Sequence, residues 1–206
     1  NAVLLPFRDF FSRDGAWLAL AFVLFYKLGD TMASAMTTPF YLDLGYSKTE
    51  IGTVVKLFGF WATIAGGTLG GIWILRVGLN RALWWFGLGQ MLSTLGFVVL
   101  AGIAPGIAAL AAVVAVENLT AGLGTAAFVG FMAALTDRRF TATQYALLSS
   151  LMGVPRVLAS APTGWLAQWL GWPGFFLLCT LIAIPGLLLL RWITRQEFVA
   201  PSPTNS

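Results

Sequence analysis

WLALAFVLFYKLGDTMASAM (residues 17–36) is apolar over most of its length, yet it carries Lys27 and Asp30 three positions apart. An α-helix of about 20 apolar residues spans the hydrocarbon core of a bilayer, which is about 30 Å thick. A charged side chain at that depth costs about 3 kcal/mol on insertion scales, so it usually faces protein or water. The stretch therefore predicts a transmembrane helix whose Lys27 and Asp30 side chains turn towards a partner or a cavity.

The composition of the whole chain agrees with a membrane protein. Of its 206 residues 58% are hydrophobic and 10% are charged, and the mean hydropathy is +0.83, whereas a soluble domain has about 25% charged residues. The chain has no histidine, so proton handling would fall to aspartate and glutamate. The single cysteine, Cys179, excludes an intramolecular disulfide and a metal site of several cysteines. We expect Cys179 to pack as a small apolar residue, and we predict no metal and no cofactor.

Six segments have the length and apolar character of spanning helices, and each is bounded by glycine, proline or charged residues. They are residues 15–37, 50–75, 82–104, 106–135, 143–169 and 173–193. The predicted fold is an all-α membrane protein with one six-helix transmembrane domain over residues 15–195. Residues 1–14 are expected to form a cytoplasmic loop that leads into this domain. Residues 196–206 are polar and contain proline, and they are expected to form a disordered cytoplasmic tail.

The basic residues that lie between the spans are distributed very unevenly. One side of the predicted domain has eight arginines, and the other side has a single lysine, Lys48. The eight arginines are Arg8, Arg13, Arg76, Arg81, Arg138, Arg139, Arg191 and Arg195. Because cytoplasmic loops are enriched in lysine and arginine, this distribution predicts that both termini are cytoplasmic.

Five charged residues fall inside the predicted spans: Lys27 and Asp30 in the first, Lys56 in the second, Glu117 in the fourth and Arg156 in the fifth. The third and sixth spans have none in their interiors. The helices therefore split into two triplets, each with two polar members and one lipid-like member, which resembles the 3+3 helix repeat of transporter halves. Lys27, Glu117 and Arg156 are expected about half-way across the bilayer, the level at which transporters bind substrates.

Small polar residues accompany these charges at helical spacing and form a stripe on each of four spans. A polar stripe within a bilayer has to face a protein partner or a water-filled cavity. The stripes are Lys27, Asp30, Thr31, Ser34 and Thr38; Thr49, Gly52, Thr53, Lys56 and Thr63; Glu117, Thr120, Gly124 and Thr125; and Ser149, Gly153, Arg156, Ser160 and Thr163.

Two interpretations of these charges remain open at this point. The charges could form structural ion pairs between or within helices, for example Lys27 with Asp30, Asp30 with Lys56, or Glu117 with Arg156. Alternatively the four stripes converge on a functional site, as intramembrane ionisable residues commonly do. Three cations against two acids leave a net charge of +1 in the interior, which favours an anionic ligand.

The sequence GGTLGG (residues 66–71) contains two overlapping GxxxG pairs, Gly66 with Gly70 and Gly67 with Gly71. Small residues at this spacing allow two transmembrane helices to approach closely. The stretch therefore predicts a packing surface between helices, with a helix contact that moves as the alternative.

Several stretches together resemble the C-terminal half of the muropeptide permeases (AmpG type), a branch of the major facilitator superfamily. They run in order over most of residues 4–195. The stretches are LPFRDFFSRDGAW, YKLGD, VVKLFGFWATIAGGTLGG, VENLTAGLGTAAFVGFM, ATQYALLSS and SLMGVPR.

The resemblance implies a transporter of twelve helices in two six-helix halves, with this chain holding helices 7 to 12. Residues 1–14 would then be the loop between the halves, and the N-terminal six-helix half would be the partner. The resemblance further implies a proton-driven importer in the bacterial inner membrane. Its cargo would be N-acetylglucosaminyl-anhydromuramyl peptides for cell-wall recycling, with a link to β-lactamase induction. In the superfamily, helices 7, 8, 10 and 11 line the cavity, which matches the four spans that carry charges here.

On this hypothesis the charged and amide side chains divide into binding and coupling roles. Glu117 or Asp30 would take up the periplasmic proton when the cavity opens outward. The substrate carboxylate would engage Lys27, Lys56 or Arg156. Amide hydrogen bonds to sugar hydroxyls or peptide groups would come from Asn118 and Gln144.

RVGLNR (residues 76–81) resembles the basic loop between helices 8 and 9 of the superfamily. It departs from the usual pattern because Leu75 stands where an acidic residue normally precedes the first arginine. Arg76 and Arg81 could brace a cytoplasmic gate, or they could simply anchor the loop on the cytoplasmic side.

Other classes of function fit the sequence less well. An intramembrane enzyme is disfavoured because the chain has no histidine, no GxSxG and no second acid in a GxGD context. A transporter of another anionic solute, and a structural or channel-forming subunit without transport activity, stay as alternatives. Nothing in the sequence indicates nucleic-acid binding; the expected surroundings are the lipid bilayer. A site between two six-helix halves would need both, so this chain is not expected to transport alone.

Overall fold

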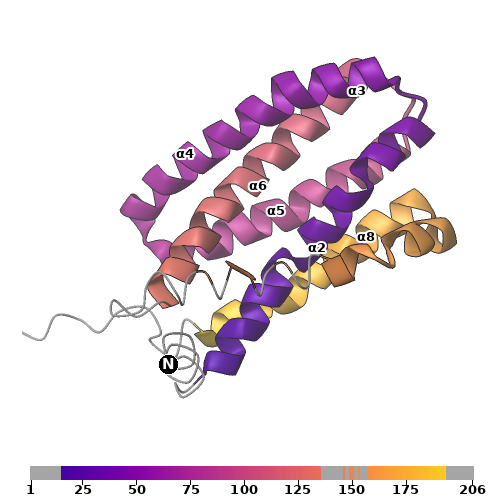
Figure 1. Cartoon of the computed structure of the whole chain (residues 1–206). Helices are drawn as coiled ribbons and strands as arrows, with labels where there is room; N and C mark the ends of the chain where they lie inside the picture. The colour runs from indigo at the N-terminus through magenta and orange to yellow at the C-terminus, as the bar shows by residue number, and fades with distance from the viewer. Residues whose placement is uncertain (1–14, 136–145, 147–148, 151–152, 154–156, 194–206) are drawn as a thin grey trace, which may run out of the picture.

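The structure is a computed structural model that describes residues 15–135, 146, 149–150, 153 and 157–193 (Figure 1). Within these residues the regular elements are all helices. They are α2 (Ala16–Asp43), α3 (Lys48–Val54), the π-helix η1 (Val55–Gly59), α4 (Phe60–Val77), α5 (Leu79–Ala101), α6 (Ile107–Leu135) and α8 (Thr163–Ile193). Since α3, η1 and α4 follow one another without a break, they form one long helix.

In the part of the chain that the structure describes, five helices are long and apolar enough to cross a membrane, namely Ala16–Asp43, Lys48–Val77, Leu79–Ala101, Ile107–Leu135 and Thr163–Ile193. Four of them correspond to the first four predicted spans. The last combines the end of the predicted span 143–169 with the predicted span 173–193. Gly171 divides it, because its backbone (φ 68°, ψ 167°) is not helical and two helices meet there at a kink. Most of residues 143–156 lies outside the described residues.

The first helix is longer than predicted. The prediction ended this span at residue 37, before Pro39, but α2 continues through Pro39 to Asp43. A proline within a transmembrane helix is tolerated where neighbouring groups hold the chain in place. Here the indole N–H of Trp172 in α8 donates a hydrogen bond to Asp43 Oδ2 at 3.1 Å, which fixes the last turn of α2.

The start of α3 is stabilised by a capping box. The Ser47 hydroxyl accepts a hydrogen bond from the Glu50 backbone N–H at 3.2 Å, and Glu50 Oε2 accepts one from the Ser47 backbone N–H at 2.8 Å. The pair satisfies two backbone N–H groups that a helix start would otherwise leave without partners.

Ser47→Ala is expected to lower the free energy of unfolding by about 1 kcal/mol, the usual cost of losing an N-cap side chain. Reversible unfolding in mixed detergent micelles measures this difference. Thr49→Ala is the matched control, because Thr49 is exposed in the same first turn and no capping bond involves its side chain. An equal loss in both variants would contradict a specific role for the cap.

Close helix contacts depend on glycine at several crossings. In Figure 1, α4 lies along α6, and α2 along α8. An added Cβ at Gly66 would clash with the Leu119 carbonyl of α6, and one at Gly70 would lie 3.0 Å from Ala126 Cβ. At Gly67 and Gly71 an added Cβ would meet nothing within 4 Å. The predicted packing role of this stretch is therefore confirmed for the pair Gly66 and Gly70.

The buried side chains form two hydrophobic clusters, one towards each end of the bundle. The first comprises parts of all four of α2, α5, α6 and α8, including Phe22, Phe86, Phe131 and Leu190. The second comprises other parts of these helices together with α3, and includes Phe40, Phe97, Val114 and Phe176. Buried Cys179 belongs to this second cluster, as its predicted packing role requires.

A polar layer lies between the two clusters. On each helix, polar side chains occur between the residues assigned to the first cluster and those assigned to the second. They are Lys27 and Asp30 on α2, Gln90, Ser93 and Thr94 on α5, Glu117 and Thr120 on α6, and Thr180 on α8. The helices thus bring these polar side chains together half-way along the bundle, the level at which the sequence predicted Lys27 and Glu117.

Candidate functional site

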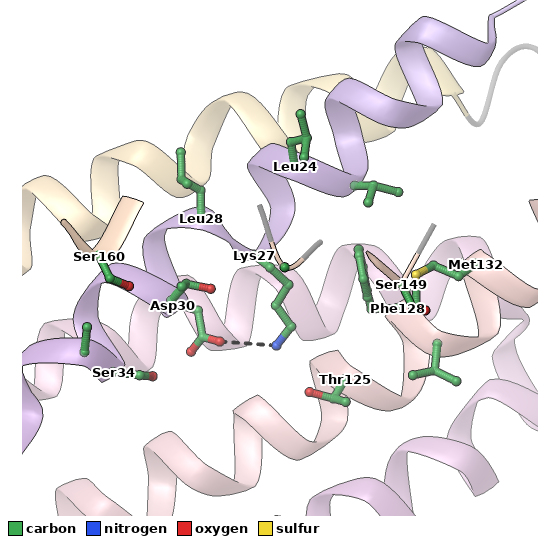
Figure 2. A pocket seen from close by; sticks show the side chains of 15 residues that line it. Leu24, Lys27, Leu28, Asp30, Ser34, Thr125, Phe128, Met132, Ser149 and Ser160 are labelled. Atoms are coloured by element: carbon green, nitrogen blue, oxygen red, sulfur yellow. Dashed lines mark hydrogen bonds and ion pairs between the residues drawn. The ribbon is translucent and has the colours of Figure 1, made fainter. Parts of the chain in front are cut away.

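Lys27 and Asp30 form the ion pair at the centre of the polar layer. Lys27 Nζ lies 3.3 Å from Asp30 Oδ2, and the two side chains keep 15% and 18% of their exposed area. Figure 2 shows the two side chains pointing towards one another across one turn of α2. The spacing of three residues allows this contact within a single helix.

Gln90 of α5 is a second partner of Lys27. The Lys27 ammonium donates a hydrogen bond to Gln90 Oε1 at 3.4 Å, and Gln90 itself is buried. Gly124 of α6 makes this approach possible, since a Cβ there would lie 2.6 Å from Gln90 Oε1 and 4.0 Å from Lys27 Nζ. Three helices therefore meet at the Lys27 ammonium group.

Glu117 lies on α6 in the same layer and is buried. Asn118 Nδ2 donates to Glu117 Oε2 at 3.2 Å and to the Val114 carbonyl at 2.8 Å. Asn118 Oδ1 accepts a hydrogen bond from the Thr63 hydroxyl of α4 at 3.2 Å. Asp30 and Lys27 both act on Glu117 through their charges, so the two acids and the lysine form one electrostatic group.

A hydroxyl pair joins α5 to α6 beside these charges. The Thr120 hydroxyl lies 2.8 Å from the Ser93 hydroxyl, and Ser93 in turn donates to the Gln90 backbone carbonyl at 2.9 Å. Thr94 donates to the same carbonyl at 3.1 Å. These bonds connect the helix turn that carries Gln90 with the turn that carries Glu117.

A cavity with a volume of about 640 Å³ lies beside the Lys27–Asp30 pair. Its polar lining comes from three of the four predicted stripes, and its walls include Leu24, Phe128 and Met132 (Figure 2). The polar lining residues are Lys27, Asp30, Thr31 and Ser34 of α2, Thr125 of α6, and Ser149 and Ser160 of the predicted fifth span. The cavity thus combines an ammonium, a carboxylate and several hydroxyls.

The remaining predicted site residues lie elsewhere. Lys56 is exposed on η1 and does not line the cavity. Asn118 bonds Thr63 of α4, and neither Asn118 nor the adjacent Glu117 lines the cavity. Gln144 and Arg156 lie outside the described residues, so the predicted pair of Glu117 with Arg156 also has no structural description.

Arg76 and Arg81 lie on either side of the junction between α4 and α5, and both are exposed. Gly78 makes the junction short: its φ of 83° and ψ of 156° end one helix and begin the next, a conformation that favours glycine. The role of Arg76 and Arg81 at a cytoplasmic gate stays a prediction.

Gln90 is the residue that sequence reasoning missed, because the third span was expected to be lipid-like. That expectation is wrong, since α5 buries Gln90, Ser93 and Thr94 in the polar layer. A scan for charges does not detect an amide. A signal was present in QMLST (residues 90–94), where three polar side chains share one side of an otherwise apolar helix.

The comparison with known families agrees with this architecture of long apolar helices around a polar layer. The sequence model of the Major Facilitator Superfamily matches residues 4–206. The chain belongs to the major facilitator superfamily. It is therefore a multi-pass membrane protein of a transporter family and not an enzyme, and its helices form one half of the fold of that family.

Three relatives show which branch of the superfamily the chain resembles. It is 43% identical over 197 residues to the anhydromuropeptide permease of Escherichia coli (strain K12), covering 95% of the chain and 40% of that protein. It is 40% identical over 196 residues to a Rickettsia conorii protein that carries the name AmpG 4, covering 95% of the chain and 47% of that protein. An uncharacterised protein of Haemophilus influenzae is 40% identical over 209 residues, which cover 96% of the chain and 49% of that protein.

The chain is thus an AmpG-like member of the superfamily that spans less than half the length of these relatives. The resemblance to the muropeptide permeases that the sequence suggested is confirmed at this level.

Proposed function

We propose that the chain is one half of a proton-coupled importer of anhydromuropeptides, which moves N-acetylglucosaminyl-anhydromuramyl peptides into the cytoplasm for cell-wall recycling. The observation that carries the proposal is the cavity beside the Lys27–Asp30 pair, at the level of the polar layer. The similarity to the E. coli anhydromuropeptide permease supports the choice of substrate. Import of such fragments would also connect the protein with β-lactamase induction.

The chemistry of the cavity lining suits an anhydromuropeptide. The ammonium of Lys27 would bind a peptide carboxylate, and the hydroxyls of Thr31, Ser34 and Ser160 would bind sugar hydroxyls and peptide groups. Apolar walls such as Phe128 would cover the less polar sugar faces. The other side of the site would come from the N-terminal six-helix half of the complete transporter, with residues 1–14 leading from one half to the other.

Coupling to the proton gradient would proceed by an exchange of partners. When the substrate carboxylate engages Lys27, Asp30 loses its counter-ion and a proton becomes a favourable replacement. Glu117 is the second candidate for proton uptake, because it is buried and interacts with both charges of the pair. Release of substrate and proton to the cytoplasm would restore the Lys27–Asp30 ion pair.

The proposal also assigns the surroundings of the site. The domain over residues 15–195 would lie in the bacterial inner membrane with both termini cytoplasmic, and residues 196–206 would form the cytoplasmic tail. Arg76 and Arg81 would then brace the cytoplasmic end of the transport path. Further substrate contacts would come from Lys56, Asn118, Gln144 and Arg156 as the two halves move.

Uptake by vesicles that contain the complete transporter tests this function directly. We expect uptake of radiolabelled anhydromuropeptide to saturate with concentration and to require an inwardly directed proton gradient. Vesicles without the protein, and vesicles whose gradient has been collapsed by an ionophore, are the controls. Saturable uptake of a different anionic solute, with no competition by muropeptide, would overturn the substrate assignment. A flux that does not saturate would indicate a channel.

A further inference from the structure

We propose that Gln90 is a positioning residue for the Lys27 ammonium group, and that its side-chain carbonyl holds Lys27 in place whenever Asp30 is not available as a counter-ion. This inference rests on the proposed function, in which Asp30 gains a proton or changes partner during transport. It assigns a role to a buried amide on α5, the helix between α6 and α8.

The geometry places Lys27 between two acceptors. Its Nζ lies 3.3 Å from Asp30 Oδ2 and 3.4 Å from Gln90 Oε1. A partly buried ammonium group inside a transmembrane segment is strongly destabilised when it loses its hydrogen-bond partners. If Asp30 becomes neutral, Gln90 Oε1 still accepts, since a carbonyl oxygen does not depend on proton uptake. Lys27 can therefore stay charged and in place through that step.

The amide of Gln90 is oriented for this contact and not for its own hydrogen bonding. In the part of the chain that the structure describes, Gln90 Nε2 is buried and has no hydrogen-bond partner. An amide with a purely structural role would normally satisfy both of its ends. Rotation by 180° would place the NH₂ group against the Lys27 ammonium, which is donor against donor. The ammonium thus fixes which end of the amide faces it.

Gly124 supplies the space that the contact requires. An added Cβ at this position would lie 2.6 Å from Gln90 Oε1, closer than real side chains come to an oxygen. Gly89 of α5 lies in the same region, but an added Cβ there would lie 3.8 Å from Thr120 Cγ2, an ordinary contact. The two glycines therefore form a matched pair for testing the contact.

Other titratable groups also act on Asp30 and have to be held constant in a test. They are Lys27 and Tyr26 on α2, Glu117 on α6 and Cys179 on α8. On α5, the residue that faces the Lys27–Asp30 pair is Gln90, which does not titrate. Measurements at one fixed pH with Asp30→Asn as the neutral form of the acid avoid titrating the whole group.

A double-mutant cycle in the complete transporter tests the proposal through thermal unfolding. Asp30→Asn alone and Gln90→Met alone should each lower the Tm slightly. The first replaces the counter-ion of Lys27 with a neutral amide acceptor, and the second removes the amide acceptor on α5. The double variant should lower the Tm by about twice the sum of the two single changes or more, as groups that share a partner do not act additively. Additive changes would overturn the proposal.

Two further variants separate positioning from packing. Gln90→Glu in the Asp30→Asn background should restore the Tm, because it returns a carboxylate to Lys27 from the other helix. Failure of this rescue would contradict a direct role for residue 90 on Lys27. If the Asp30→Asn, Gln90→Met protein does not fold, Gly124→Ala replaces the methionine change. With Asp30→Asn it should act more than additively, whereas Gly89→Ala should not.

The cycle needs neither a proton gradient nor a muropeptide, so it is independent of the uptake experiment. Additive changes together with normal uptake would overturn the role of Gln90 and leave the proposed function intact. Tm changes that are more than additive, in a protein that takes up no muropeptide, would overturn the proposed function and leave the role of Gln90 at Lys27 intact.

Discussion

Glu117→Gln is expected to reduce gradient-driven muropeptide uptake in the complete transporter to the level of empty vesicles while the protein stays folded. The glutamine keeps the size of the side chain and can still accept the hydrogen bond that Asn118 Nδ2 donates at 3.2 Å. It cannot take up or release a proton. Uptake by vesicles under an imposed pH gradient measures the first effect, and the Tm measures the second.

Glu50→Gln is the control for this experiment. Glu50 is an acid outside the polar layer, at the start of α3, where its carboxylate completes the capping box. Its replacement should lower the Tm slightly and leave uptake intact. Unchanged uptake in Glu117→Gln would remove Glu117 from the mechanism, and loss of uptake in Asp30→Asn would then assign the proton to Asp30. Loss of folded protein in Glu117→Gln would give the residue a structural role.

Gly66→Ala is expected to lower the free energy of unfolding substantially. The added methyl group would clash with the Leu119 carbonyl oxygen and would lie 3.0 Å from Leu119 C and 3.1 Å from Leu123 N. These are backbone atoms of α6, which cannot move aside as a flexible side chain can. The helices α4 and α6 would have to separate, and overpacking of this kind costs about 1–3 kcal/mol. Reversible unfolding in mixed micelles measures the change.

Gly67→Ala is a control of the same chemistry one residue along. An added Cβ at Gly67 meets nothing within 4 Å. Since alanine is a better helix former than glycine by about 1 kcal/mol, this variant should be as stable as the original or more so. The two substitutions therefore have opposite expected signs. Similar losses from both would show that the close approach of α4 to α6 does not limit stability.

The sequence predicted much of the fold because membrane spans leave a strong signal. Long apolar segments located α2, α5 and α6 to within a few residues at most ends. The prediction failed at Pro39, where a local rule about proline was outweighed by contacts of the helix end, including the bond from Trp172 to Asp43. The π-helical stretch Val55–Gly59 has no sequence signature that would have predicted it.

The candidate site was predicted in part. Charge spacing offered the contact of Lys27 with Asp30 as one of several possible pairings, and helical periodicity predicted that stripes from several helices share a cavity. Lys56 does not share this cavity: it is exposed, as are Thr49, Thr53 and Thr63 of its predicted stripe. Gln90 was missed because its role depends on what lies opposite, the Lys27 ammonium and the gap at Gly124.

The π-helical stretch Val55–Gly59 also determines which side of α4 faces α6, because α4 continues from it in the same long helix. A π-helical turn accommodates one residue more than an α-helical turn does. Deleting a single residue from it would turn the downstream surface by about 100° around the helix axis. Gly66 and Gly70 would then no longer face α6. The π-helical turn thus orients Gly66 and Gly70 towards α6. The packing of α4 on α6 therefore depends on the number of residues in this turn as well as on the glycines themselves.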